Sequence, residues 1–397
     1  MDQTRKINPA LTLLALAISA FGIGSTEFIS VGLLPLIVSD LGVTLSNASL
    51  TVSLYAIGVT IGAPVMTVLT SKFSRKNVLL LVMVVFIIGN LIAALSPTFT
   101  ILLVGRVVSA LAHGVFMSIA SVIAADVVAP NKRGSAIALM FTGLTVATVT
   151  GVPLGTFIGQ ATQWRYSFIF IVLIGVIALI ATLLLVPKNL SKGAAISLGD
   201  IGKVLSNFRL LLVLLITALG YGGIFVVYTY ISPVLKEFMG YSDSAIVLIL
   251  VIYGVMVAIG NTIGGRLSNN RPLRAVFFVF ILKAFNMLLI LAFLNFHLLG
   301  LFAVLLMGLF SFMNVAGLQL LAVQLAEKYV PNAIAMASAL NISAFNIGIA
   351  LGSYIGGRVI TTVGLQWTPL FGFIMVFIAA IITLIWLLVD REKNKKY

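Results

Sequence analysis

The chain consists of long apolar runs separated by short polar gaps. The runs show no alternation of apolar and polar residues, so they indicate helices rather than strands. A helix needs about 20 mostly apolar residues to cross a bilayer. The pattern predicts twelve spans, at 11–36, 48–70, 78–95, 100–125, 135–158, 166–186, 210–233, 245–267, 275–295, 298–324, 335–357 and 368–389.

Composition agrees with a membrane protein. Hydrophobic residues make up 61% of the 397 positions and charged residues only 9%, against about 25% charged in soluble domains. So few charges cannot solvate the surface of a soluble fold of this length, so lipid must cover the outside. The first run follows Arg5 and Lys6 and is too long for a signal peptide, so we interpret it as an uncleaved span.

The basic residues predict the orientation. With the N-terminus inside, 19 of the 24 Lys and Arg residues fall in cytoplasmic gaps or termini, as the positive-inside rule requires. This places both termini in the cytoplasm of a multi-pass protein of the bacterial cytoplasmic membrane. The net charge of +14 is accounted for in the same way, so no nucleic-acid partner is expected.

The two halves of the chain repeat each other. At offsets of 198 and 201 residues, the matched pairs are Tyr55 with Tyr253, Gly62 with Gly260, Asp126 with Glu327, Gly151 with Gly352, and Gly155 with Gly356. Spans 1–6 therefore correspond to spans 7–12. We predict an amino-terminal six-helix bundle at 1–187, a cytoplasmic linker at 188–209 that contains a short interfacial helix near 198–208, and a carboxy-terminal bundle at 210–397.

Four motifs follow one another in a recognisable order: "STEFISVGLLP" at 25–35, "LLVGRVVSALAHG" at 102–114, "GVPLG" at 151–155, and the pair Trp164-Arg165. Together they resemble the major facilitator superfamily over the whole chain, and within it the twelve-span drug:proton antiporters and their sugar- and purine-efflux relatives. The resemblance implies an all-α fold of two bundles around a central cavity on spans 1, 4, 7 and 10.

One motif departs from the family pattern. The loop between spans 2 and 3 reads Ser71 to Lys76 and lacks the usual Asp and Gly. Lys72, Arg75 and Lys76 remain as candidate gating residues. The resemblance implies that Arg75 pairs with Asp126 as a latch on the outward-open state. The alternative is that these are solvated charges.

Glu27 is the one acid well inside a predicted span. A charge at the bilayer centre costs about 2.5–3.5 kcal/mol on insertion scales, and burial favours the neutral carboxyl group, which suits reversible protonation. Arg106 lies at a matching depth in span 4 and is the expected counter-charge, and His113 follows two turns later. We assign these three residues to proton coupling, with structural pairing as the alternative for each. For Lys283, in span 9, snorkelling or a local partner is favoured over transport.

Glycines recur at four- or eight-residue spacing in span 5 and again in span 11. Gly151, Pro153 and Gly155 are the gating candidates among them, because a smooth ridge allows close helix contact and proline bends it. The ridge is expected to serve as a rocking interface between the halves, as ordinary close packing, or as both.

Candidate solute contacts are polar or adaptable side chains on the cavity spans: Tyr221, Tyr228, Asn314, Gln319, Asn341 and Met117. Phe116, Phe312 and Met313 are further apolar candidates. This set suits moderately sized amphipathic solutes.

The sequence contains no nucleotide-binding loop, metal-ligand cluster or nucleophile constellation, so neither an enzyme nor a cofactor is expected. We predict a monomer that exports small amphipathic solutes, such as drug-like, sugar or purine compounds, in exchange for protons by alternating access. Proton-coupled uptake is the first alternative, and a receptor without transport is the second.

Overall fold

In a computed structural model of the chain, residues 9–70, 73–129, 133–187, 190, 198–268 and 271–394 are described, and their regular structure is helical. Within these residues, twelve segments are long and apolar enough to cross a membrane, which confirms the predicted number of spans. The amino-terminal half contains α1 (Pro9–Leu41), α2 (Leu45–Ala48), α3 (Leu50–Thr70), α4 (Arg75–Ala94), α5 (Phe99–Asp126), α6 (Arg133–Val146), η2 (Ala147–Gly151), α7 (Val152–Ala161) and α8 (Trp164–Leu185).

The linker contributes the short helix α9 (Leu198–Leu205), inside the range predicted for an interfacial helix. The carboxy-terminal half contains α10 (Phe208–Tyr228), α11 (Ile231–Glu237), α12 (Asp243–Ser268), α13 (Pro272–Phe293), α14 (His297–Ser311), α15 (Val315–Tyr329), η3 (Pro331–Ala333), α16 (Ile334–Thr362), η4 (Leu365–Trp367) and α17 (Thr368–Asn394).

Spans 5 and 10 are interrupted in their interiors. Span 5 passes from α6 through the π-helical turn η2 into α7, directly before Pro153. Proline has no N–H to donate to the preceding turn, and a π turn accommodates the released carbonyl. Span 10 is divided into α14 and α15 by the residues between Ser311 and Val315, where the sequence has neither proline nor glycine.

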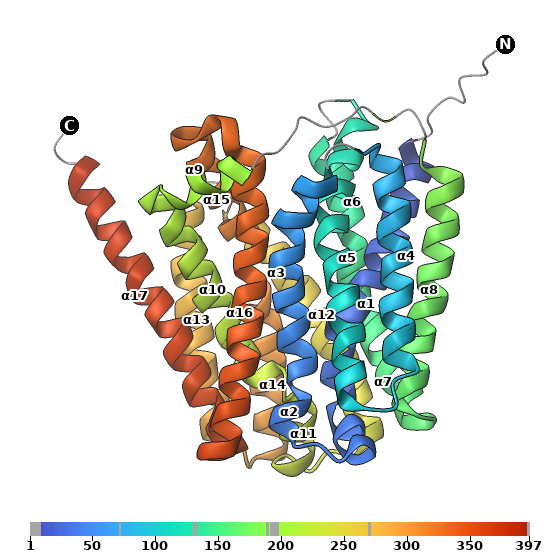
Figure 1. Ribbon diagram of the computed structural model, residues 1–397. Helices are drawn as coiled ribbons and strands as arrows, with labels where there is room; N and C mark the ends of the chain where they lie inside the picture. Colours follow the sequence, from blue (N-terminus) through green and yellow to red (C-terminus); the bar gives the residue numbers. More distant parts are fainter. Residues whose placement is uncertain are drawn as a thin grey trace.

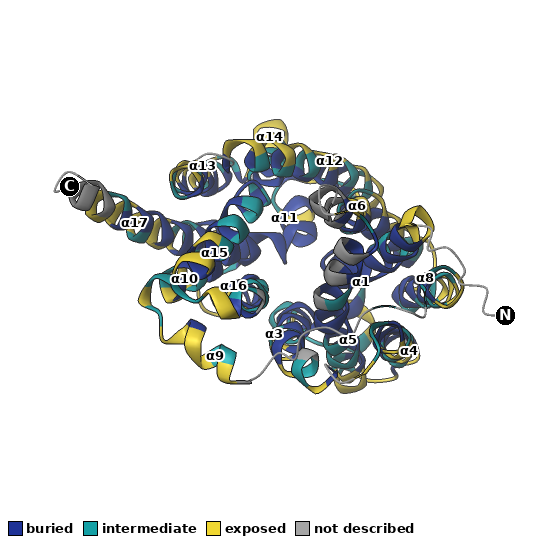
Figure 2. Ribbon diagram, turned by 90° about the horizontal axis from the view of Figure 1, so that it is seen from above, coloured by how far each residue is buried: buried dark blue, intermediate teal, exposed yellow. Residues whose placement is uncertain are grey.

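The helices stand side by side as two bundles (Figure 1). The start of α1, the end of α17 and α9 lie at one end of the molecule, whereas α2 and α11 lie at the other, which we call the distal end. Seen along the bundle axis, α1, α4, α5 and α8 group on one side and α10, α13, α16 and α17 on the other (Figure 2).

The halves meet along two pairs of helices, α3 with α16 and the η2–α7 segment with α12. In the first pair, Thr60 and Ser343 each donate a side-chain hydroxyl to the other's carbonyl, at 3.4 and 3.2 Å. In the second, Gly254 lies against the backbone of Thr148. Nearer the distal end, the Ser232 hydroxyl donates to the Val31 carbonyl across the halves.

The repeat predicted from the sequence reappears in matched contacts. The Tyr55 hydroxyl lies 3.1 Å from His113 Nδ1, and the Tyr253 hydroxyl lies 2.8 Å from Ser311 Oγ. Both pairs are 58 residues apart, so they occupy equivalent places in the two halves. The two bundles therefore repeat each other in their contacts as well as in their sequence.

Candidate functional site

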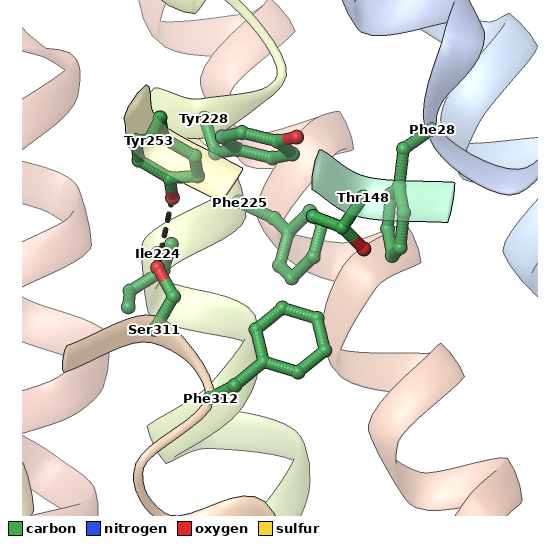
Figure 3. Close-up of a pocket in the computed structure, with 8 residues that line it drawn as sticks. All are labelled: Phe28, Thr148, Ile224, Phe225, Tyr228, Tyr253, Ser311 and Phe312. Carbon is green, nitrogen blue, oxygen red and sulfur yellow. Dashed lines mark hydrogen bonds between the residues drawn. The ribbon is translucent and has the colours of Figure 1, made fainter. Parts of the chain in front are cut away.

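A small pocket lies between the halves (Figure 3). Its lining residues are Phe28, Thr148, Ile224, Phe225, Tyr228, Tyr253, Ser311 and Phe312. Phe28 and Thr148 come from α1 and η2 of the amino-terminal half, and the others come from the carboxy-terminal half. Five of the eight are aromatic, so the pocket presents flat apolar faces with a few hydroxyl groups at their edges.

The aromatic rings pack against one another across the two halves. Phe28 stacks on Phe225 at a centroid distance of 6.0 Å and meets Phe312 edge-on at 6.4 Å. Tyr228 stacks on Tyr253 at 5.1 Å, and the Tyr253 hydroxyl is held by Ser311 (Figure 3). This arrangement fits offset and edge-to-face aromatic pairing and gives the pocket defined walls.

Glu27 is the residue before Phe28 on α1. Its side chain is buried, with 8% of the residue exposed. Among the described residues, its carboxylate has neither a hydrogen bond nor an ion pair. An unpaired carboxylate inside a membrane span is costly while it is charged, so this group is suited to binding and releasing a proton.

Arg106 does not bind the Glu27 carboxylate, so the expected ion pair is not formed in this conformation. Its guanidinium donates instead to three backbone carbonyls: those of Thr26 at 2.6 Å and Glu27 at 3.2 Å on α1, and that of Thr51 at 2.9 Å on α3. The fork of five N–H donors explains how one side chain reaches two helices. Arg106 therefore fixes the backbone beside Glu27 and brings a positive charge close to it.

His113 joins this group through a residue that the sequence reasoning did not assign to the site. The Arg106 guanidinium lies 4.1 Å above the Tyr55 ring, and the Tyr55 hydroxyl meets His113 Nδ1. The three predicted proton-coupling residues are thus brought together, with Tyr55 between Arg106 and His113. The one signal for Tyr55 in the sequence was its match with Tyr253 in the repeat.

The predicted solute contacts divide into two tyrosines at the pocket, a methionine away from it, and three amides that bind other protein groups. Tyr228 lines the pocket, and Tyr221 lies beside it, edge-on to Phe312 at 5.6 Å. Met117 is buried on α5, and it is not among the residues that line the pocket.

The two amides Asn341 and Gln319 bind each other instead of facing the pocket. The Thr217 hydroxyl donates to Asn341 Oδ1 at 2.8 Å, and Asn341 Nδ2 donates to Gln319 Oε1 at 2.8 Å. Gln319 in turn donates to the Ser338 hydroxyl. These hydrogen bonds connect α10, α15 and α16. In this conformation the two amide groups therefore have protein partners.

Asn314, the remaining amide, accepts a hydrogen bond from Lys283 Nζ at 2.6 Å. Lys283 is fully buried on α13, so the snorkelling expectation is wrong and the expectation of a local partner is confirmed. Its other acceptors are the carbonyls of Ser311 at 2.9 Å and Gly220 at 3.3 Å.

The gating candidates are only partly visible. Lys72 and the side chain of Asp126 lie outside the described residues, so the Arg75–Asp126 latch stays a prediction. Lys76 is not a solvated charge: it is 5% exposed and donates to the carbonyls of Leu183 and Val186 at the end of α8. It stabilises the carboxy-terminal end of that helix.

The glycine ridge of span 5 faces α1 of the same half. A Cβ at Gly151 would meet the Ser25 side chain, and one at Gly155 would meet Ile29. These contacts are close packing within one half. Span 5 meets the other half at η2, where Gly254 of α12 lies against Thr148. Pro153 is buried next to the ridge.

Within the described residues, no group of three metal-ligating side chains gathers at one place. What the described residues bring together is a buried carboxyl group at Glu27 and an aromatic pocket between the halves.

Known proteins resemble this chain over most of its length. The sequence model of the Major Facilitator Superfamily matches residues 16–334 of this chain. The uncharacterized MFS-type transporter YtbD of Bacillus subtilis is 55% identical over 96% of each chain. The inner membrane transport protein YdhP of Escherichia coli is 38% identical over 93% of this chain and 94% of its own.

Two further likenesses concern activity and fold. A chloramphenicol resistance protein of Streptomyces lividans is 35% identical over 66% of this chain and 68% of its own. The crystal structure of a bacterial homologue of the lysosomal transporter Spinster, in an inward-facing conformation, superposes with a TM-score of 0.73 at 15% identity and covers 97% of both chains. At that identity the second likeness concerns the fold alone.

Proposed function

The chain belongs to the major facilitator superfamily of membrane transporters, and we propose that it exports small amphipathic solutes in exchange for protons, with Glu27 as the proton-binding acid. The observation that carries the proposal is the unpaired carboxylate of Glu27, buried in α1 next to a residue that lines the pocket. The charge pattern of the gaps supports an orientation with both termini in the cytoplasm and the distal end outside.

In this cycle, a proton that arrives from outside neutralises Glu27 and removes the cost of its charge in the membrane interior. The charged form is tolerated best near the Arg106 guanidinium, which is held by the carbonyls of residues 26 and 27. Protonation therefore changes the balance between conformations that keep Glu27 close to Arg106 and conformations that expose it to the other side. Release of the proton inside resets the cycle.

The membrane potential is sufficient to drive such an exchange. One elementary charge that crosses 100 mV provides about 2.3 kcal/mol. Since a tenfold concentration ratio corresponds to about 1.4 kcal/mol, one net proton supports roughly a 40-fold gradient of a neutral solute per 100 mV.

The pocket suggests the kind of solute. Five aromatic rings and the hydroxyls of Thr148, Tyr253 and Ser311 suit a flat, largely apolar compound with a few polar groups. The chloramphenicol resistance of one relative supports drug export, and chloramphenicol is an aromatic compound of this kind. Thermal-shift measurements on the purified protein with chloramphenicol, a purine nucleoside and a monosaccharide would show which class stabilises it.

The coupling role is tested in proteoliposomes under an imposed pH gradient, with labelled chloramphenicol and a labelled purine nucleoside as the transported compounds. Glu27→Gln should abolish pH-driven accumulation and retain exchange of solute without a gradient, because the neutral amide cannot release a proton. Glu237→Gln, the same change at an exposed distal position, is the matched control and should transport as the parent does.

The direction of movement in the parent distinguishes export from uptake. Accumulation against the direction of the proton gradient supports exchange, whereas movement with the protons indicates symport. Full pH-driven activity in Glu27→Gln would refute the coupling role.

A further inference from the structure

The break in span 10 leaves a backbone carbonyl without its helical donor. In a continuous α-helix the Val315 N–H would donate to the Ser311 carbonyl, four residues earlier. Here the Val315 N–H donates to the Phe312 carbonyl at 3.1 Å, because α14 ends at Ser311 and α15 begins only at Val315. A carbonyl without a donor in the membrane interior is expensive, so another group must replace the missing N–H.

Lys283 is that group. Its Nζ lies 2.9 Å from the Ser311 carbonyl and 2.6 Å from Asn314 Oδ1, so it binds the residues on both sides of the break. It reaches them from α13, where it is fully buried. No carboxylate among the described residues lies within ion-pair distance of it. A cation at the carboxy-terminal end of α14 is also favoured by the helix dipole.

The residue that the break presents to the pocket is Phe312. It lines the pocket and meets two rings edge-on, Phe28 of the other half at 6.4 Å and Tyr221 at 5.6 Å. In a continuous helix the backbone of residues 312–314 would follow a different path, and Phe312 would leave this position. The equivalent span of the amino-terminal half, α5, runs from Phe99 to Asp126 without a break.

We infer that Lys283 is a positioning residue: by replacing the missing N–H at the break in span 10, it holds Phe312 in the wall of the central pocket and so determines which solutes the pocket fits. The last step rests on the proposed function, because it takes the pocket as the solute site. The position of Phe312 can be tested without any solute, and the result does not depend on Glu27 or on proton coupling.

The absence of cysteine from the chain makes the test direct. Single cysteines are introduced at Phe312 and, in a separate protein, at Thr148, which faces the same pocket from the amino-terminal half. The rate of modification by N-ethylmaleimide is then measured on the purified protein in three backgrounds: the parent, Lys283→Met and Asn286→Leu. Asn286 is the matched control, because it lies one turn along α13, is buried and donates to the regular part of α14 at Ala303.

Lys283→Met should change the modification rate at position 312 by at least fivefold and leave that at position 148 within twofold. Asn286→Leu should leave both within twofold. A rate at position 312 that changes by less than twofold in Lys283→Met overturns the inference, and so does an equal change at both positions, which would indicate general loosening. If Lys283→Met does not fold, Lys283→Gln, which keeps an N–H donor on a side chain one bond shorter, should fold and give a smaller change at position 312 only.

Discussion

Arg106 and Lys283 are buried cations of the two halves, and their partners differ in kind. Arg106 donates to carbonyls within the continuous helices α1 and α3. These carbonyls have helical donors already, so the bonds from Arg106 are additional. Lys283 donates to a carbonyl at a helix break, which has no helical donor. The first cation is therefore placed to act on a nearby acid, whereas the second completes the backbone of its own half.

This difference separates the effects of removing each charge. Lys283→Met leaves the Ser311 carbonyl and the Asn314 side-chain oxygen without a donor, at about 1–3 kcal/mol for each buried unsatisfied group. Removal of the buried charge offsets part of this cost, so we expect a loss of roughly 2–4 kcal/mol of unfolding free energy. Arg106→Met leaves its carbonyls with their helical donors and removes the cost of burying a charge. We expect a change of about 1 kcal/mol or less, together with the loss of pH-driven transport. Unfolding followed in detergent and transport in proteoliposomes measure the two effects.

Equal losses of unfolding free energy in the two variants would contradict the claim that Lys283 replaces a missing helical donor and Arg106 does not. So would pH-driven transport that persists in Arg106→Met and disappears in a folded Lys283 variant.

The sequence predicts the two cations unequally well. The hydrophobic runs and the repeat give the twelve spans, and residue counting along them gives the depth of Glu27 and Arg106. Depth, however, does not reveal a partner on another helix. The proximity of Arg106 to Glu27 was therefore predictable, but the choice of backbone carbonyls over the carboxylate was not.

The interruptions of spans 5 and 10 show the same limit. Pro153 predicts the distortion of span 5, because proline lacks the N–H that a regular helical turn requires. The break in span 10 falls at Phe312, Met313 and Asn314, none of which interrupts a helix by its own chemistry. Lys283, on another helix, binds the carbonyl at that break, so the group that satisfies it is brought there by packing and leaves no local signal. The pairing of Asn341 with Gln319 was hidden for the same reason.

The glycine contacts of the two halves offer a second comparison. A Cβ at Gly352 would meet the backbone carbonyl of Gly222 on α10, whereas a Cβ at Gly155 would meet only side-chain atoms, Cδ1 and Cγ1 of the buried Ile29. Overpacking costs about 1–3 kcal/mol where the neighbour cannot move, and alanine gains about 1 kcal/mol over glycine in a helix.

We therefore expect Gly352→Ala to lower the free energy of unfolding by about 1–2 kcal/mol and Gly155→Ala to lower it by about 1 kcal/mol or less, because a side chain can move where a backbone carbonyl cannot. Thermal unfolding of the two purified variants measures the difference. A larger loss in Gly155→Ala would show that the α1 contact of span 5 is the tighter one.

The matched tyrosines give the smallest and most closely controlled comparison. Tyr55→Phe and Tyr253→Phe each remove one hydroxyl from equivalent positions. After the second change, the Ser311 hydroxyl keeps its bond to the Met307 carbonyl, so the cost should be a few tenths of a kcal/mol, near the average of about 0.6 for such bonds in membranes. Tyr55→Phe leaves Nδ1 of the buried His113 without this partner, so the cost should approach about 1 kcal/mol. Unfolding of the single variants in detergent tests which of them loses more stability. A greater loss in Tyr253→Phe would mean that the hydroxyl at the pocket contributes more than the hydroxyl beside His113.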